Sequence, residues 1–189
     1  MDGVVALEPV AAISELERRF AALVGTHRER ARRLAWRLVG GDDAAAEDVT
    51  QDAFVKAYQG LGRFRDESSL ETWFYRILVR QAANHRRWRG VRERWWGGDV
   101  DAPDPQPRPP GDPGLRRRIA AALDQLSGLQ RESFVLVHME GFTVRESAEI
   151  LGRPMGTVKS HLHRALRSLR SELADLHPSE AGTAEEKPE

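Results

Sequence analysis

Residues 141–173 have the sequence GFTVRESAEILGRPMGTVKSHLHRALRSLRSEL, and this pattern predicts the fold of the C-terminal part of the chain. Thr143 followed three residues later by Glu146 is a capping box, in which each side chain bonds to the backbone N–H of the other residue. An apolar run follows directly, so the pattern predicts a short helix over about 144–151.

Three residues at fixed spacings predict how this helix connects to the next one. Ala148 is small where a second helix must cross closely, and Gly152 suits a turn that requires positive φ. Val158 then provides the apolar anchor of the following helix. Together they predict a helix-turn-helix over about 144–166, with Pro154 in the first turn of its second helix.

The second helix has an outward face of short polar and basic side chains. Such a face near a helix N-terminus matches a recognition helix in a DNA major groove. An ordinary αα-hairpin shares much of the pattern, but the basic character of the whole exposed face favours DNA binding. The outward residues are Thr157, Lys159, Ser160, His163, Arg164 and Arg167. His161 and His163 predict no metal site, because helix residues two apart do not face one another.

The balance of 29 basic and 29 acidic residues hides a strong segregation of charge. Residues 76–94 contain seven Arg and one Glu, and residues 153–170 contain four Arg, one Lys and no acid. Residues 42–52, by contrast, contain five acids and no base. One Arg-rich run alone is typical of a solvated helix face, but two separated runs indicate two binding sites for a polyanion.

Composition excludes several classes of protein. The absence of cysteine excludes a disulfide framework, a thiolate zinc site and a cysteine nucleophile. No apolar run approaches the roughly 20 residues of a membrane helix, and the N-terminus lacks the basic segment of a signal peptide. We therefore expect a soluble, cytoplasmic protein without membrane insertion.

Proline marks the boundary between two units. Six of the ten prolines fall in 103–113. Because proline removes backbone donors and disfavours helix at the preceding residue, residues 97–114 are predicted to form a semi-extended linker. The linker separates an N-terminal unit, 12–96, from a C-terminal unit, 115–176, which an acidic tail, 177–189, follows. Both units have helical periodicity, so the predicted fold class is all-α, with two small helical domains.

The N-terminal unit has an acidic helix face and a basic one. Helices are predicted over 16–38, 43–60 and 69–90, the last opened by a capping box that begins at Ser68. The helix 43–60 carries Glu47, Asp48, Gln51 and Asp52 on adjoining turns. Paired carboxylates suit acid–base catalysis or Mg²⁺ binding, but no pocket-forming loop accompanies them. An acidic face that meets a basic helix of a partner fits better.

Arginine, amide and aromatic side chains gather on the loop and helix that follow. Guanidinium groups neutralise phosphates and aromatic faces stack on unpaired bases, so this mixture suits single-stranded or distorted DNA. Trp73 and Phe74 lie on the apolar stripe and are predicted core residues, which leaves Phe64 and Trp88 as exposed aromatic candidates. The polar members of the set are Arg65, Arg76, Arg80, Asn84, Arg86, Arg87 and Arg89.

Three segments carry a resemblance to a known family: AEDVTQDAF (46–54), SLETWFYRILVRQAANHRRWR (69–89) and LSGLQRESFVLVHMEGFTVRESAEILGRPMGTVKSHLHRAL (126–166). The chain resembles the extracytoplasmic-function sigma factors of the sigma-70 family of bacterial transcription initiation factors. The first segment is similar to the core-binding signature of region 2, the second to its promoter-melting and minus-10 helix, and the third to region 4. The resemblance covers nearly the whole chain outside the linker and the tail.

The resemblance implies a function and its residues. The chain is expected to be a non-catalytic alternative sigma factor that binds core RNA polymerase and promoter DNA, and that an anti-sigma factor inhibits. No cofactor, metal or small-molecule substrate is expected. The implied polymerase contacts are Glu47, Asp48, Gln51 and Asp52. The implied minus-10 contacts are Arg63, Phe64, Arg65, Arg76, Arg80, Asn84 and Arg87. The implied minus-35 contacts are Thr157, Lys159, Ser160, His161, His163, Arg164 and Arg167.

Two other functions compete with this interpretation. A stand-alone helix-turn-helix regulator would bind duplex operator DNA without polymerase, but it would need neither the acidic face nor the Arg/Trp helix. An enzyme would use the carboxylates of 42–52 with His27 or His85, but the sequence has no pocket signature for it. The chain also departs from the family pattern, with Arg80 where many relatives have Asn and His161 where Arg is usual. Arg80 predicts an altered minus-10 preference. His161 removes a fixed charge near the minus-35 element and predicts a mild pH sensitivity there.

Overall fold

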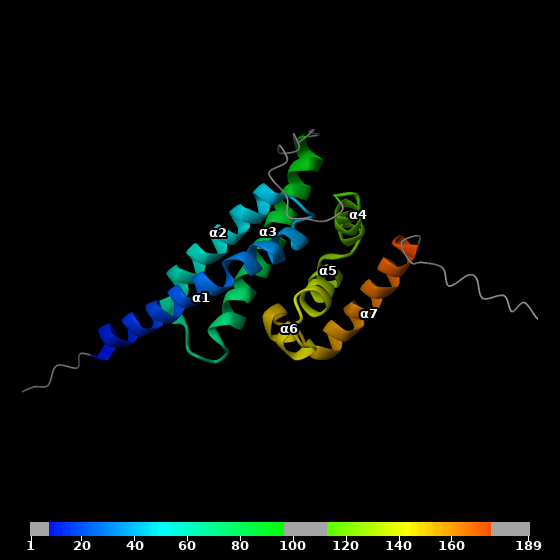
Figure 1. Cartoon of the computed structure of the whole chain (residues 1–189). Helices are drawn as coiled ribbons and strands as arrows, with labels where there is room; N and C mark the ends of the chain where they lie inside the picture. The colour runs from blue at the N-terminus through cyan, green and yellow to red at the C-terminus, as the bar shows by residue number, and fades with distance from the viewer. Residues whose placement is uncertain (1–7, 97–112, 175–189) are drawn as a thin grey trace, which may run out of the picture.

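The structure, a computed structural model, describes residues 8–96 and 113–174 (Figure 1). The predicted all-α fold class is confirmed, since the described ranges contain helices and turns and no strand. The N-terminal part consists of α1 (Glu8–Leu38), α2 (Asp43–Gly60), the short 3-10 helix η1 (Leu61–Arg63) and α3 (Leu70–Trp96). The C-terminal part consists of α4 (Pro113–Asp124), α5 (Gly128–Phe134), the π-helical turn η2 (Val135–Met139), α6 (Val144–Leu151) and α7 (Met155–Glu172).

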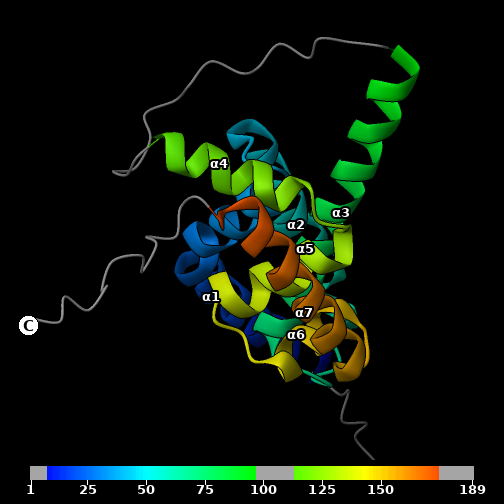
Figure 2. The same cartoon turned by 90° about the vertical axis from the view of Figure 1, so that its right-hand side faces the viewer.

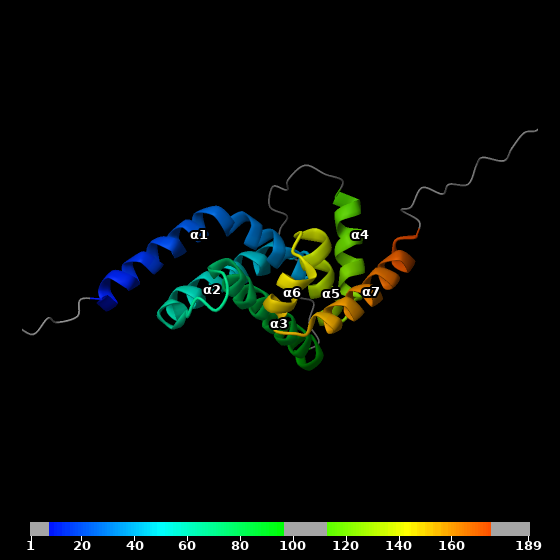
Figure 3. The ribbon, with the colours of Figure 1, turned by 90° about the horizontal axis from the view of Figure 1, so that it is seen from below.

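Helices α1, α2 and α3 pack around a shared apolar core (Figures 1 and 3). Leu34 of α1 and Leu78 of α3 are completely buried in it. The ring of Phe54 on α2 stacks on that of Phe74 on α3, with centroids 4.4 Å apart. The rest of the buried side of α2 is mostly alanine and valine, so α2 approaches its neighbours closely and turns its polar residues outward.

The helix boundaries differ from the predicted ones at four places. Helix α1 begins at Glu8 and not at residue 16. The cap of α3 is Ser69 and not Ser68, because the helix begins one residue later and the Ser69 Oγ accepts the Thr72 N–H at 3.0 Å. Helix α3 continues to Trp96, and Pro113 and Gly114 of the predicted linker belong to α4. The remainder of that linker and the whole of the predicted acidic tail lie outside the described residues.

The helix-turn-helix forms as the sequence predicts. The Thr143 N–H donates to the Glu146 carboxylate at 2.8 Å, and the Glu146 N–H donates to the Thr143 hydroxyl at 3.1 Å. Gly152 has φ 60°, the left-handed conformation expected of it, and Val158 is fully buried. Pro154 differs by one residue: it precedes α7, and its carbonyl accepts the N–H groups of Thr157 and Val158 at 3.0 and 3.2 Å.

The two parts of the chain also pack against one another, which the sequence did not predict. Helix α6 contacts α3, and η2 contacts α1 (Figures 1 and 3). Arg131 of α5 is buried and donates across this boundary to the Leu38 carbonyl at 3.3 Å, as well as to the Leu123 carbonyl at 2.7 Å. The buried residues of both parts therefore form a single core.

Candidate nucleic-acid interface

The outer side of α2 is acidic. Asp42 caps the helix by accepting the Ala45 N–H at 2.9 Å, which fixes where α2 begins. Asp48, Gln51 and Asp52 are exposed, and Glu47 is exposed while accepting a hydrogen bond from Arg28 at 3.3 Å. The four predicted polymerase contacts therefore lie together on the surface, opposite the buried side of the helix.

The loop that leads into α3 places two of its three predicted minus-10 contacts on the surface. Arg63 and Arg65 are exposed. The sequence predicts an exposed Phe64, but the structure shows this side chain half-buried. Its ring packs on that of Trp73, with the two centroids 5.3 Å apart. The sequence did not predict a structural role for Asp66 in this loop. Asp66 has φ 52° and accepts a hydrogen bond from Arg19 at 3.0 Å. Aspartate is among the few non-glycine residues that tolerate a positive φ. The hydrogen bond from Arg19 joins this loop to α1.

The predicted minus-10 residues of α3 follow one side of the helix, because they are spaced by three or four positions. Arg80 is exposed, and Arg87 donates to the Asn84 amide oxygen at 2.6 Å. Arg76 lies in a different environment, because it contacts the end of α6. It donates to the backbone carbonyl of Glu149 from Nη2 at 2.8 Å and from Nε at 3.1 Å.

Two arginines from the same basic run serve the packing of the fold. Arg86 pairs with Glu132 of α5 at 2.7 Å and donates to the Leu38 carbonyl at 3.1 Å. Arg89 donates to the Val39 carbonyl at 3.1 Å. Burial raises the pKa of Glu132, while the charge of Arg86 opposes that rise. Sequence alone did not separate these structural arginines from the exposed ones, since no local signal marks them.

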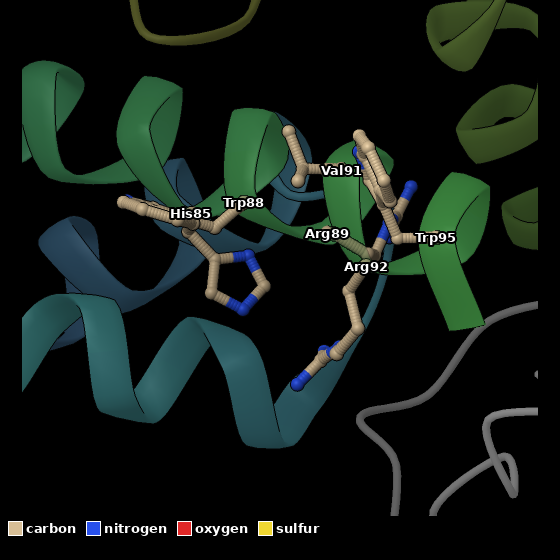
Figure 4. Close-up of a pocket in the computed structure, with 6 residues that line it drawn as sticks. All are labelled: His85, Trp88, Arg89, Val91, Arg92 and Trp95. Atoms are coloured by element: carbon tan, nitrogen blue, oxygen red, sulfur yellow. The ribbon is translucent and has the colours of Figure 1, made fainter.

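The last turns of α3 carry an exposed aromatic and basic surface. This end of the helix projects beyond the helices of the C-terminal part (Figure 2). Trp88 and Trp95 are 73% and 77% exposed, which confirms the expectation for Trp88. They border a hollow of about 590 Å³, together with His85, Val91, Arg89 and Arg92 (Figure 4). Flat rings beside guanidinium groups form a surface that suits the stacking of unpaired bases.

The outward side of α7 carries most of the predicted minus-35 contacts. Lys159, Ser160, His163, Arg164 and Arg167 are exposed, whereas Val158, Ala165 and Leu169 anchor the opposite side in the core. Thr157 is half-buried. His161 is half-buried too, and its Nδ1 is buried without a hydrogen-bond partner in the structure.

The described residues contain neither a metal-binding cluster nor a membrane-spanning helix. No cluster of three or more His, Asp or Glu side chains within residues 8–96 and 113–174 has the geometry to hold a metal ion. In the same two ranges, none of the helices combines the length and the apolar character that a membrane span requires.

Comparison with known proteins finds two family regions in the chain. The family model described as Sigma-70 region 2 matches residues 23–91, and the model described as Sigma-70, region 4 matches residues 116–169. The first includes α2 and most of α3, and the second includes the helix-turn-helix.

Named relatives and solved structures agree with these matches. The chain is 34% identical to the RNA polymerase sigma-H factor of Pseudomonas aeruginosa, over 71% of this chain and 76% of that protein. It is 36% identical to the ECF RNA polymerase sigma factor SigE of Mycolicibacterium smegmatis, over 84% of this chain and 62% of that protein. It also resembles the sigma factor RpoE of Bartonella quintana, solved in complex with the anti-sigma factor NepR, with 28% identity and a TM-score of 0.69 over 83% of this chain and 98% of that chain.

A second solved neighbour is CnrH in complex with the cytosolic domain of CnrY, with 27% identity and a TM-score of 0.65 over 90% of this chain and 96% of that chain. The two regions, their order and these relatives define the class of protein. The chain belongs to the sigma-70 family, in its extracytoplasmic-function group. It is therefore an alternative sigma factor, a protein that directs transcription initiation.

Proposed function

We propose that the chain performs this role through three exposed faces and without catalytic chemistry of its own. The acidic face of α2 docks on core RNA polymerase, the Arg-Asn side of α3 with its preceding loop holds the minus-10 strand, and the basic side of α7 reads the minus-35 duplex. The protein acts in the cytoplasm on promoter DNA. The observation that carries the proposal is the presence of all three faces, with complementary chemistry, within the two family regions of one chain.

The chemistry of each face suits its proposed partner. Carboxylates on α2 complement a basic surface of the polymerase, and such complementarity sets partner choice and association rate. Arginines on α3 neutralise the phosphates of a single strand. Unstacking a base costs a few kcal/mol, which contacts to the extruded bases offset, so binding energy alone opens the DNA. The exposed N-terminal turns of α7 suit base edges in a major groove.

We infer that an anti-sigma protein is a further partner. The solved neighbour from Bartonella quintana is a sigma factor bound to its anti-sigma factor, and the likeness covers most of both chains. An inhibitor of this kind acts most directly by covering the surfaces that bind polymerase or DNA.

Gel filtration with sigma-free core RNA polymerase tests the proposal. The wild-type protein is expected to co-elute with core enzyme at one-to-one stoichiometry. The variant Asp48→Arg with Gln51→Ala is expected to lose this binding, because a charge reversal opposes docking on a basic surface. Arg164→Ala is the matched control, since it should retain polymerase binding and weaken only minus-35 recognition.

Two outcomes would contradict the assignment. If both variants kept full affinity for core polymerase, α2 would not be the docking face. If the wild-type protein did not co-elute with active core enzyme, a stand-alone regulator that binds duplex operators would replace the initiation factor, and operator selection on duplex DNA would then be the decisive experiment.

A further inference from the structure

Helix α3 passes beside the turn that joins α4 to α5 (Figures 1 and 2). A hollow of about 430 Å³ lies between them. Four guanidinium groups line this arginine hollow: those of Arg86, Arg87 and Arg89 from α3 and that of Arg131 from α5. Of the four, Arg87 is the one that belongs to the proposed DNA contacts. The three proposed binding faces therefore do not explain why four like charges gather here.

Two carboxylates offset part of the charge of the arginine hollow. The Asp124 carboxylate pairs with Arg131 at 2.9 Å and with Arg89 at 3.6 Å. The Glu132 carboxylate pairs with Arg86 at 2.7 Å. Among the described side chains, four guanidinium groups thus face two carboxylates, so the hollow attracts anions.

The arginines keep N–H donors that the fold does not use. A guanidinium has five N–H donors and no acceptor. Arg86 forms two hydrogen bonds, one to the Leu38 carbonyl and one to Glu132, and Arg87 forms one, to the Asn84 amide oxygen. Arg87 is exposed at the rim of the hollow, whereas the side chain of Arg86 is only 15% exposed. Donors therefore remain for a ligand both at the rim and inside the hollow.

Space and electrostatics also favour an anion in the arginine hollow. Gly128 lines it, and a Cβ at this position would lie 3.3 Å from the Arg86 Nη2, so the lack of a side chain keeps this group accessible. Burial lowers the pKa of Arg131, and the nearby charge of Arg86 lowers it further, because like charges repel. A bound anion offsets this repulsion.

We propose that the arginine hollow is a binding site for a compact polyphosphate anion with two linked phosphoryl groups, such as pyrophosphate or the diphosphate of a nucleotide. Guanidinium groups bind phosphoryl oxygens through paired N–H donors, and these oxygens only accept. Guanidinium groups on two sides of the hollow, from α3 and from α5, favour an anion with more than one phosphoryl group. The volume lies in the range of about 300–1,000 Å³ that small-ligand sites have.

Isothermal titration calorimetry of the full-length protein with sodium pyrophosphate, at fixed ionic strength, tests the site. The wild-type protein is expected to bind pyrophosphate at one-to-one stoichiometry. Ala83 is a half-buried residue that lines the hollow. Ala83→Glu places a carboxylate there, one helical turn before Arg87, and should weaken binding by about tenfold or more. Ala83→Gln has nearly the same size and no charge, so it is the matched control and should bind as the wild-type protein does.

A second pair of variants tests the site without adding a side chain to it. Arg87→Gln removes the exposed guanidinium and should also weaken pyrophosphate binding by about tenfold or more, since it removes a charge-assisted hydrogen bond. Arg170→Gln removes the same charge from an exposed position of α7 and should leave the affinity unchanged. Circular dichroism of each variant confirms that the helices are intact.

A nucleic-acid backbone also carries phosphoryl groups, so the same variants are compared with a fluorescent single-stranded DNA 30-mer of random sequence. No pyrophosphate binding, with weaker DNA binding in Ala83→Glu than in Ala83→Gln, would assign the hollow to DNA and overturn the free polyphosphate. Equal losses of pyrophosphate affinity in Arg87→Gln and Arg170→Gln would also overturn the site, because they indicate diffuse attraction. Binding of orthophosphate as tight as that of pyrophosphate would overturn the need for two phosphoryl groups. Co-elution with core polymerase tests the proposed function separately.

Discussion

The arginines of the basic segment 76–94 on α3 have different roles, because their side chains lie in different environments. Arg86 is paired with Glu132 across the boundary between the two parts, and Arg76 bonds to a carbonyl of α6. Arg80 and Arg92 are exposed. Neighbouring positions of a helix turn to different sides, so a basic run identifies a helix but does not say which of its charges are available to DNA.

Trp88 is an exposed aromatic residue of α3 that lies among the basic side chains of this helix, so we expect it to stack on DNA bases. We expect Trp88→Ala to weaken binding of a random-sequence single-stranded 30-mer by about 1–3 kcal/mol, the range for one stacked base. Fluorescence anisotropy measures the change. Leu115→Ala, which removes a partly exposed apolar side chain from α4 and not from the hollow, is the control and should bind as the wild-type protein does. Equal losses in both variants would contradict the stacking role of Trp88.

At the scale of the element, the helix-turn-helix is specified by local chemistry. The reciprocal bonds between Thr143 and Glu146 begin α6, and Gly152 at φ 60° ends it. Each of these interactions involves residues close in sequence, so each forms whenever the local helix does. The backbone bond from Thr143 lowers the pKa of the Glu146 carboxylate.

That lowered pKa predicts a pH-dependent contribution to stability. A carboxylate with a lower pKa in the folded state stabilises the fold above its unfolded pKa, and this contribution is lost as the pH falls through the folded pKa. The melting temperature of the wild-type protein should therefore exceed that of Glu146→Gln near neutral pH, and the two should converge as the pH falls through the lowered pKa of Glu146. Thermal melts followed by circular dichroism measure the difference, and a gap that stayed constant with pH would contradict the prediction.

At the scale of the whole molecule, ion pairs between distant segments hold the two parts together. Glu132 and Glu140 come from the C-terminal part and are mostly buried against arginines of α3 and α1. A buried tyrosine, Tyr75, lies in the same region. Its hydroxyl forms a hydrogen bond with the His27 ring at 3.2 Å, and its ring makes an edge contact with that of Phe142. Burial raises the pKa of Tyr75, so its hydroxyl stays neutral at physiological pH.

Arg86→Met should destabilise the protein by about 3–5 kcal/mol at neutral pH, because it leaves Glu132 buried without a partner. Burial already raises the pKa of Glu132, and loss of Arg86 raises it further. A carboxyl with a raised pKa in the folded state destabilises the fold as the pH rises, so the deficit should shrink in acid. Urea denaturation at two pH values measures this loss of unfolding free energy.

Arg92→Met, at an exposed position of the same helix, is the control. An equal loss of stability in this variant would contradict the proposed contribution of the buried Arg86–Glu132 pair.

Three features could be predicted from the amino-acid sequence: the all-α class, the helix-turn-helix with its cap and its glycine, and the exposed acidic side of α2. These features depend on hydrophobic periodicity and on contacts within a few residues, which local composition specifies. Three others depend on the folded structure: Phe64 packs on Trp73, Arg86 and Arg89 stabilise the packing, and α6 contacts α3. The interactions that join the two parts link residues 35 to 110 positions apart, as in Arg89–Asp124 and Arg30–Glu140, and no local pattern encodes such a pairing.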